Sequence, residues 1–467
     1  LSPYLGFNGS HQASMLAAPG SDLIRRGASA APYPVYMLIA AIFALYALDK
    51  ARKRKLKFFR GPLDYAVFLL PLIAALSIPG AWDTRGAVNL ALLLACCAAL
   101  YWLTSNLYSQ DTAYLLLTAL FAGAVLISIR NLAPVFQGTA ATLEALGAYL
   151  SASFLCGLYL ISVYQRLPAR LALSGGCFLI LLTALALRSW VTCLVLLLGT
   201  IFLLIGSPKE SRRKMLGQVM IPAAIAAPTT AHAASTAVTP SWLWLCTGLF
   251  LVLTLQYTWH RMEQYTTYPQ PTDEDNIYTP GQTYRRLRPW VTPAAALLLS
   301  LVVMIGAGAY INNALSQSPQ SSITLEEGLL RSRDALRIMT SDWRTFITGT
   351  GGGGWNAVYH KYQSVYYQGE VPGAFWQAGV ELGIPGIITL IAVWAFFLLL
   401  IRRTMFQPTQ YRRTISPQTS AITTAALAIG CHSILGCGFS PAALPLSLFT
   451  LFGLGSGPGL SQNRVPE

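Results

Sequence analysis

Long runs of apolar residues recur along this chain, and they constrain its fold more than any other feature. The stretches "FLILLTALAL" (178–187) and "VTCLVLLLGTIFLLIG" (191–206) carry no charged side chain. Only 11% of all residues are charged, whereas soluble domains carry about 25%. Lipid offers no hydrogen-bond partners, so backbone groups that cross a bilayer must be satisfied within helices or closed barrels. The long uncharged runs predict helices, and therefore an all-α polytopic membrane protein.

A helix needs about 20 predominantly apolar residues to cross the hydrocarbon core. This criterion predicts about 12–13 transmembrane helices and one large outer loop that carries short helices. Pro222 and Pro228 make the eighth of these spans the weakest. The predicted spans are 34–49, 62–79, 86–104, 112–130, 146–164, 168–187, 189–206, 216–236, 241–259, 291–312, 376–401, 418–436 and 440–458.

The basic residues indicate how the helices are oriented. The formal net charge is +14, and the Lys and Arg residues gather in short loops such as "KARKRKLKFFR" (50–60) and "PKESRRK" (208–214). Short basic loops between apolar spans mark the cytoplasmic side of a membrane. They also suit anionic lipid head groups, so membrane lipids are expected partners. A nucleic-acid partner is not expected, because no folded domain with a basic face is visible. The short basic loops are therefore predicted to lie on the cytoplasmic side.

If the basic loops lie in the cytoplasm and successive loops alternate between the two sides of the membrane, the chain divides into five parts. Residues 313–375 form the largest segment between spans, and their apolar spacing predicts an amphipathic helix at 324–343. The parts are an outer N-terminal stub (1–33), transmembrane helices (34–312) with a polar cytoplasmic loop (260–290), a large outer loop (313–375), C-terminal helices (376–458) and a cytoplasmic tail (459–467).

The hexapeptide "GTGGGG" (349–354) matches the G-x-G-x-x-G pattern of dinucleotide-binding proteins. That pattern is informative only between a strand and a helix of a βαβ unit. Here it follows a predicted amphipathic helix outside the membrane, and no Lys-Ser/Thr pair follows it, so we expect no nucleotide site. Two interpretations remain: a turn that lets two backbones pack closely, or a set of N–H groups that holds an anion. The residues favour the close-packing turn.

The wider stretch 333–386, "RDALRIMTSDWRTFITGTGGGGWNAVYHKYQSVYYQGEVPGAFWQAGVELGIPG", resembles the large outer loop of the O-antigen ligase and O-antigen polymerase-like family. Gln377, Glu381, Gly383 and Gly386 match that family's "Q…E.G..G" motif. Two looser similarities follow the family's order, "GTAATLEALGAYL" (138–150) and "LALRSWVTCLVLL" (185–197).

This resemblance implies a membrane glycosyltransferase without cofactor or metal. It would lie in the cytoplasmic (inner) membrane and would move or polymerise a polyprenyl-diphosphate-linked glycan on the outer face of that membrane, onto a sugar or lipid-sugar acceptor. Cations must hold the diphosphate as charge develops on it, and a base must activate the acceptor hydroxyl. The catalytic candidates are Arg188, Arg331, Arg333 and His360. The substrate-binding candidates are Gly351, Gly353, Trp355, Tyr359, Lys361, Gln377 and Glu381.

The sequence departs from the family pattern at two places. Gly328 stands where an arginine is expected, and Pro372-Gly373-Ala374 stand where the family has a histidine motif. These departures keep two alternatives open: an inactive homologue in cell-envelope polysaccharide assembly, and a multi-span transporter or flippase.

Each candidate residue also has an ordinary structural interpretation. Arg188 could extend to head groups, and Arg331 and Arg333 could belong to a solvated helix face. His360 could be a surface residue, and Glu381 could anchor the helix that follows it. The Tyr-rich stretch could form an interfacial belt instead of a platform for sugar rings. The eight cysteines form no C-x-x-C pair and are expected to be reduced, apolar residues.

Overall fold

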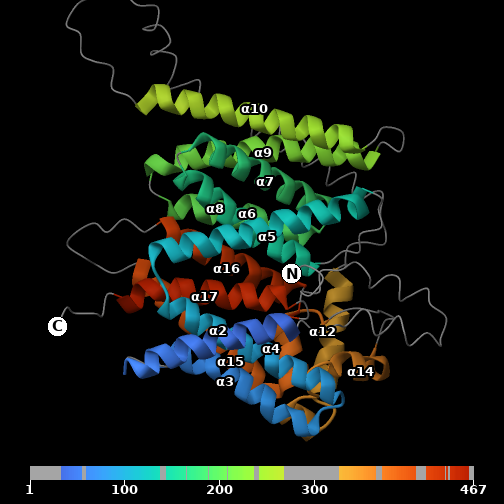
Figure 1. Cartoon of the computed structure of the whole chain (residues 1–467). Helices are drawn as coiled ribbons and strands as arrows, with labels where there is room; N and C mark the ends of the chain where they lie inside the picture. Colours follow the sequence, from blue (N-terminus) through green and yellow to red (C-terminus); the bar gives the residue numbers. More distant parts are fainter. Residues whose placement is uncertain are drawn as a thin grey trace, which may run out of the picture.

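The computed structural model describes twelve ranges of the chain, and every regular element within them is a helix (Figure 1). The ranges are 33–54, 59–136, 144–164, 166–187, 189–207, 209–235, 241–267, 325–363, 371–405, 417–436, 438–439 and 442–461. The α-helices are α2 (Tyr33–Arg52), α3 (Pro62–Ser77), α4 (Thr84–Asn106), α5 (Gln110–Phe136), α6 (Glu144–Val163), α7 (Leu167–Ala186), α8 (Trp190–Gly206), α9 (Lys209–Ser235), α10 (Ser241–Thr267), α12 (Leu325–Met339), α13 (Trp343–Thr348), α14 (Gly354–Tyr362), α15 (Ala374–Met405), α16 (Pro417–Leu435) and α17 (Ala443–Ser461). A short 3-10 helix, η3 (Ile78–Gly80), follows α3.

These helices coincide with the predicted spans. Each predicted span except 291–312, which lies outside the described residues, falls on one of α2–α10 or α15–α17. Within the described ranges, seven helices are long and apolar enough to cross a membrane, namely 33–52, 62–80, 84–106, 110–132, 144–163, 167–186 and 374–403. Three shorter apolar helices cover 190–206, 215–230 and 443–457. The described residues therefore form an all-α polytopic membrane protein, while the count of about 12–13 transmembrane helices stays a prediction.

The predicted eighth span, expected to be the weakest, contains only a shorter apolar stretch at 215–230, but its prolines do not break the helix. Helix α9 is continuous from Lys209 to Ser235 and contains both Pro222 and Pro228. Prolines are tolerated in membrane helices when neighbouring helices and local polar side chains compensate for the lost hydrogen bonds. Here α9 packs between α7 and α10.

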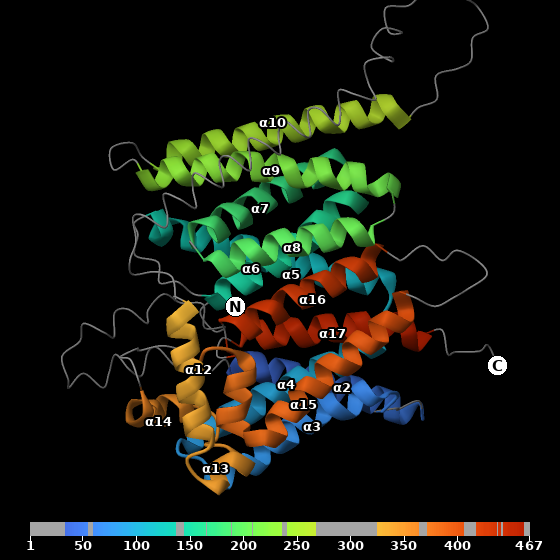
Figure 2. The same ribbon diagram turned by 180° about the vertical axis from the view of Figure 1, so that it is seen from behind.

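Successive helices alternate in direction, so the connections gather at two ends of the bundle. At one end, the start of α6 meets the end of α16, because the Glu144 carboxylate lies against Gly436. At the other end, Arg170 of α7 contacts His260 of α10, with 3.0 Å between Nη1 and Nδ1. Figure 2 shows α12 lying crosswise over the first end, with α13 and α14 beside it. Basic residues such as Arg402 and Arg403 in the last turn of α15 lie toward the second end.

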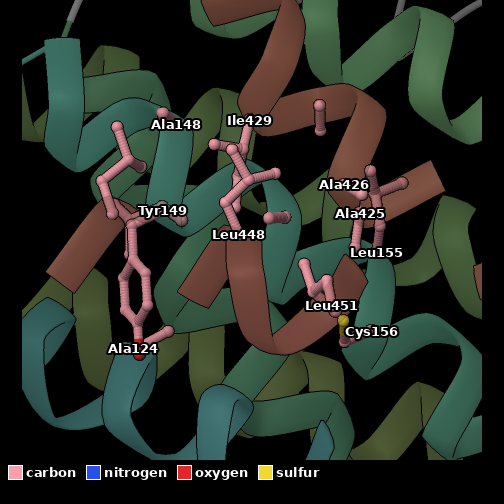
Figure 3. Packing of buried hydrophobic residues seen from close by; sticks show 14 of the residues in the cluster. Ala124, Ala148, Tyr149, Leu155, Cys156, Ala425, Ala426, Ile429, Leu448 and Leu451 are labelled. Carbon is pink, nitrogen blue, oxygen red and sulfur yellow. The ribbon is translucent and has the colours of Figure 1, made fainter. Parts of the chain in front are cut away.

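Helix α6 occupies the centre of the bundle, and nearly all of its residues are buried. Figure 3 shows Leu155 and Cys156 of this helix facing Ala425 of α16, with Leu451 of α17 close by. Small side chains at helix contacts let backbones approach closely, which strengthens van der Waals packing where lipid removes the usual hydrophobic driving force. The centre of the protein is thus a packed helical core.

Asp64 joins α3 to α4 near the second end. It is buried, and its Oδ2 accepts hydrogen bonds from the N–H groups of Arg60 (2.6 Å) and Gly61 (2.9 Å). Its Oδ1 accepts the Tyr101 hydroxyl at 2.5 Å. The carboxylate therefore satisfies free donors at the helix start and ties two helices together.

Candidate functional site

Residues 325–363, here named the cap, contain α12, α13 and α14 and cover one end of the bundle (Figure 2). Helix α12 buries Ala335, Ile338 and Met339 and exposes Leu336 on its opposite side. The predicted amphipathic helix at 324–343 is therefore present, although it ends at Met339 and α13 begins at Trp343. The short helices expected in this segment exist; which side of the membrane they face stays a prediction.

A small apolar core holds the cap against the first turns of α15. It joins α12, α14 and α15 through eight buried residues. Trp355 and Tyr359 stack within it, with ring centroids 4.4 Å apart. These rings fill the core of the cap in this structure. The core consists of Ala335, Ile338, Met339, Trp355, Val358, Tyr359, Val371 and Val380.

The "GTGGGG" stretch is a loop between α13 and α14, and its N–H groups bind protein oxygen atoms. The N–H of Thr350 donates to the carbonyl of Val380 (2.8 Å), and that of Gly351 donates to the carbonyl of Glu381 (3.0 Å). The N–H of Gly354 turns back to the carbonyl of Gly351 (3.0 Å). Because these donors are already paired with the protein, the loop is a close-packing turn and not a cradle for an anion.

Glu381 is the polar centre of this contact. It is buried, and its Oε1 accepts the Gly353 N–H at 2.8 Å, while its Oε2 accepts the Gln377 side-chain amide at 2.9 Å. The Oε1 atom of Gln377 in turn accepts a hydrogen bond of 2.6 Å from the backbone N–H of Phe439. A single chain of hydrogen bonds thus links the cap, α15 and the connection between α16 and α17. A buried carboxylate needs such partners, because an unpaired one is costly.

Two glycines make the close approach possible. Gly353 adopts φ +77° at the start of α14. Gly383 has φ +71° and ψ −167°, which breaks the helical geometry of α15 at that point. Only glycine adopts the Gly383 conformation readily. A side chain at Gly383 would also meet the carbonyl oxygen of Ile347. The break divides α15 into a short segment under the cap and a segment of about 20 residues that is itself long enough to span a bilayer.

The opposite side of the glycine loop packs on the start of α4. The N–H of Trp82 donates to the carbonyl of Thr350 at 3.0 Å. Gly86 and Gly352 lie back to back, so a Cβ on either residue would meet the carbonyl oxygen of the other. The loop is therefore clamped between α4 and α15.

The two candidate arginines of the cap, Arg331 and Arg333, point to different sides of α12. Arg331 is buried, with 4% of its surface exposed, and it lies on the face that carries Ala335 and Ile338. Arg333 is exposed. Arg188 lies outside the described residues. The structure therefore does not bring Arg331 and Arg333 together, and only Arg331 faces the bundle.

The remaining candidates in α14 lie near its end. His360 is exposed. Lys361 places its Nζ 4.7 Å from the centroid of the Trp82 ring, a cation–π contact. Lys361 thus fastens α14 to the start of α4, while the catalytic role of His360 stays a prediction.

The segment that replaces the family's histidine motif is buried. Pro372, Gly373 and Ala374 are all inaccessible, and a side chain at Gly373 would meet the carbonyl oxygen of Ser433 on α16. This region of α16 carries His432, which is fully buried. Among the described residues, neither ring nitrogen of His432 has a hydrogen-bond partner.

Sequence reasoning did not assign the residues that support the site from other elements. Trp82 and the backbone of Phe439 lie far from the glycine loop in sequence. Within the described ranges, no group of three or more His, Cys, Asp or Glu side chains could hold a metal ion.

No protein-family model, curated protein or solved structure matches the chain.

Proposed function

We propose that this protein is a membrane glycosyltransferase of the O-antigen ligase type, which transfers or polymerises a polyprenyl-diphosphate-linked glycan. The main support is that two parts of the stretch resembling that family contact each other. The glycine loop and the "Q…E.G" motif are 28 residues apart, yet the Gly353 N–H donates directly to Glu381. The proposal places the reaction at the cap end of the bundle, on the outer face of the cytoplasmic membrane.

The proposed step is a displacement at the anomeric carbon. The acceptor hydroxyl oxygen forms a bond to that carbon while the bond from carbon to the diphosphate oxygen breaks. The diphosphate leaves with the electron pair and remains attached to the polyprenyl chain, and the hydroxyl proton passes to a base. Negative charge grows on the leaving group, so a fixed cation beside it favours the transition state.

Arg331 is the cation that the cap geometry favours. It faces the bundle from α12, whereas Arg333 faces away. A guanidinium binds two oxygen atoms of a phosphate at once. The proposed base is His360, which is exposed at the end of α14.

Purified protein mixed with radiolabelled lipid-linked glycan and a glycolipid acceptor, both extracted from the membranes in which the protein naturally occurs, tests the proposal. We expect labelled glycan on the acceptor with the unaltered protein and with Arg333→Gln, and little with Arg331→Gln. Transfer that persists in Arg331→Gln would remove the assigned cation. Equal yields with and without protein would remove the proposed activity.

A second candidate is an inactive homologue that binds or scaffolds lipid-linked glycan. The burial of Pro372-Gly373-Ala374 against α16 favours it, because the histidine motif is absent and its place is filled by packing. This candidate predicts that labelled donor co-purifies with the protein although no glycan reaches the acceptor. Flux of donor across sealed vesicles without product would instead favour a flippase.

A further inference from the structure

Helix α13 exposes its apolar residues and buries a polar one. Trp343, Phe346 and Ile347 are 75%, 43% and 50% exposed, whereas Thr345 is buried. In water this pattern would leave large apolar side chains exposed to solvent on one short helix. Contiguous exposed apolar surface marks an interaction site.

The position of α13 identifies what covers this face. A side chain at Gly80, where α3 and η3 end, would meet Nη2 of Arg344. A side chain at Gly383, where the second segment of α15 begins, would meet the carbonyl oxygen of Ile347. Helix α13 therefore lies at the level where two apolar spans end, and Figure 2 shows it beside those ends.

Both neighbouring spans turn apolar side chains outward. On α3 the exposed residues recur at intervals of three or four, which places them on one helix face. On α15 the exposed apolar residues also begin just beyond Gly383. The exposed face of α13 continues these two surfaces. The residues are Tyr65, Leu69, Leu72 and Leu76 on α3, and Ile388, Ile391, Leu398 and Leu399 on α15.

We propose that α13 is an interfacial membrane-binding helix, whose Trp343, Phe346 and Ile347 side chains insert at the boundary between lipid head groups and acyl chains. Tryptophan is enriched at this depth because its ring is largely apolar and its N–H is polar. Arg344, on the same helix, can keep its guanidinium among the head groups. The cap would thus be held to the bilayer surface as well as to α15. This inference is independent of the proposed transferase activity.

Site-directed spin labelling tests the proposal. Single cysteines replace Trp343, Phe346 or Ile347 in a variant lacking the eight native cysteines, and each carries a nitroxide in phosphatidylcholine–phosphatidylglycerol liposomes. Thr340 and Asn356, both exposed polar cap residues, serve as matched controls. We expect labels at the three apolar positions to collide more with oxygen, which concentrates in lipid. Labels at the two controls should collide more with a water-soluble nickel chelate.

Three results would overturn the proposal. The first is nickel accessibility at Trp343, Phe346 and Ile347 equal to that of the controls. The second is spin–spin broadening at these positions that disappears on dilution with unlabelled protein, because a second copy would then cover the face. The third uses the protein with its native cysteines. Brominated lipids should quench the tryptophan fluorescence of the unaltered protein more strongly than that of Trp343→Phe, and equal quenching would contradict insertion.

Discussion

Replacing Glu381 with alanine removes the carboxylate that joins the cap to α15. The change leaves two donors without acceptors, the partly buried Gly353 N–H and the buried Gln377 side-chain amide. Each buried donor that loses its partner costs about 1–3 kcal/mol. The expected cost is therefore about 2–6 kcal/mol, concentrated in the contact between the glycine loop and α15.

Hydrogen exchange measured by mass spectrometry on the protein in nanodiscs reports this cost locally. Every 1.4 kcal/mol corresponds to about a tenfold change in the opening equilibrium. Backbone amides in residues 349–355 should therefore exchange roughly 30-fold to 20,000-fold faster in Glu381→Ala, given that range of free energies. Amides in the central helix α6 should change little, because they are remote from the lost bonds.

A matched control on the same helix is Thr389→Ala. Thr389 is also buried, but its hydroxyl donates only to the carbonyl of Pro385 within α15. This variant should leave exchange in the glycine loop unchanged. Glu381→Gln should give an intermediate effect, because its amide can accept from Gly353 but presents N–H groups to Gln377. Unchanged protection of residues 349–355 in Glu381→Ala would refute the reasoning.

Three further predictions concern the fold and the proposed site. Gly383→Ala should lower the unfolding temperature in detergent, because φ +71° with ψ −167° costs a non-glycine residue of order 1–3 kcal/mol. The control is Gly61→Ala, which has open space around its Cβ position. Equal unfolding temperatures for the two variants would contradict the prediction. Tyr101→Phe should lose about 1.5–3 kcal/mol in the free energy of unfolding in micelles, since its hydroxyl donates to the buried Asp64 carboxylate; a loss below a few tenths of a kcal/mol would show that the bond contributes little. Arg331→Gln should slow glycan transfer on the order of 100-fold or more, while Arg333→Gln should retain most of the rate; similar losses in both variants would argue against a cation on the buried face.

The positions of the helices could be predicted from the sequence because each apolar run contains the information locally. A stretch such as 191–206 must be helical in lipid whatever surrounds it. The continuity of α9 could not be predicted in the same way. Its prolines weaken the helix locally, and the compensation comes from packing between α7 and α10, which no local pattern encodes.

The site was predictable in part. The glycine loop and Glu381 could each be identified, and the resemblance placed them in one functional stretch. Their direct contact depends on the break at Gly383 and on the start of α4, both of which are tertiary features. For Trp355 and Tyr359 the sequence could not decide between an exposed platform and a core, because α14 is only nine residues long. The structure places both rings inside the cap.

Sealed proteoliposomes containing the purified protein, lipid-linked glycan and acceptor provide the most direct test of the central claim. Glycan on the acceptor and free polyprenyl diphosphate are measured in the same samples. The account predicts that both products appear in equal amounts with the unaltered protein, and that both fall together in Arg331→Gln. Movement of intact donor across the membrane with neither product formed would contradict it.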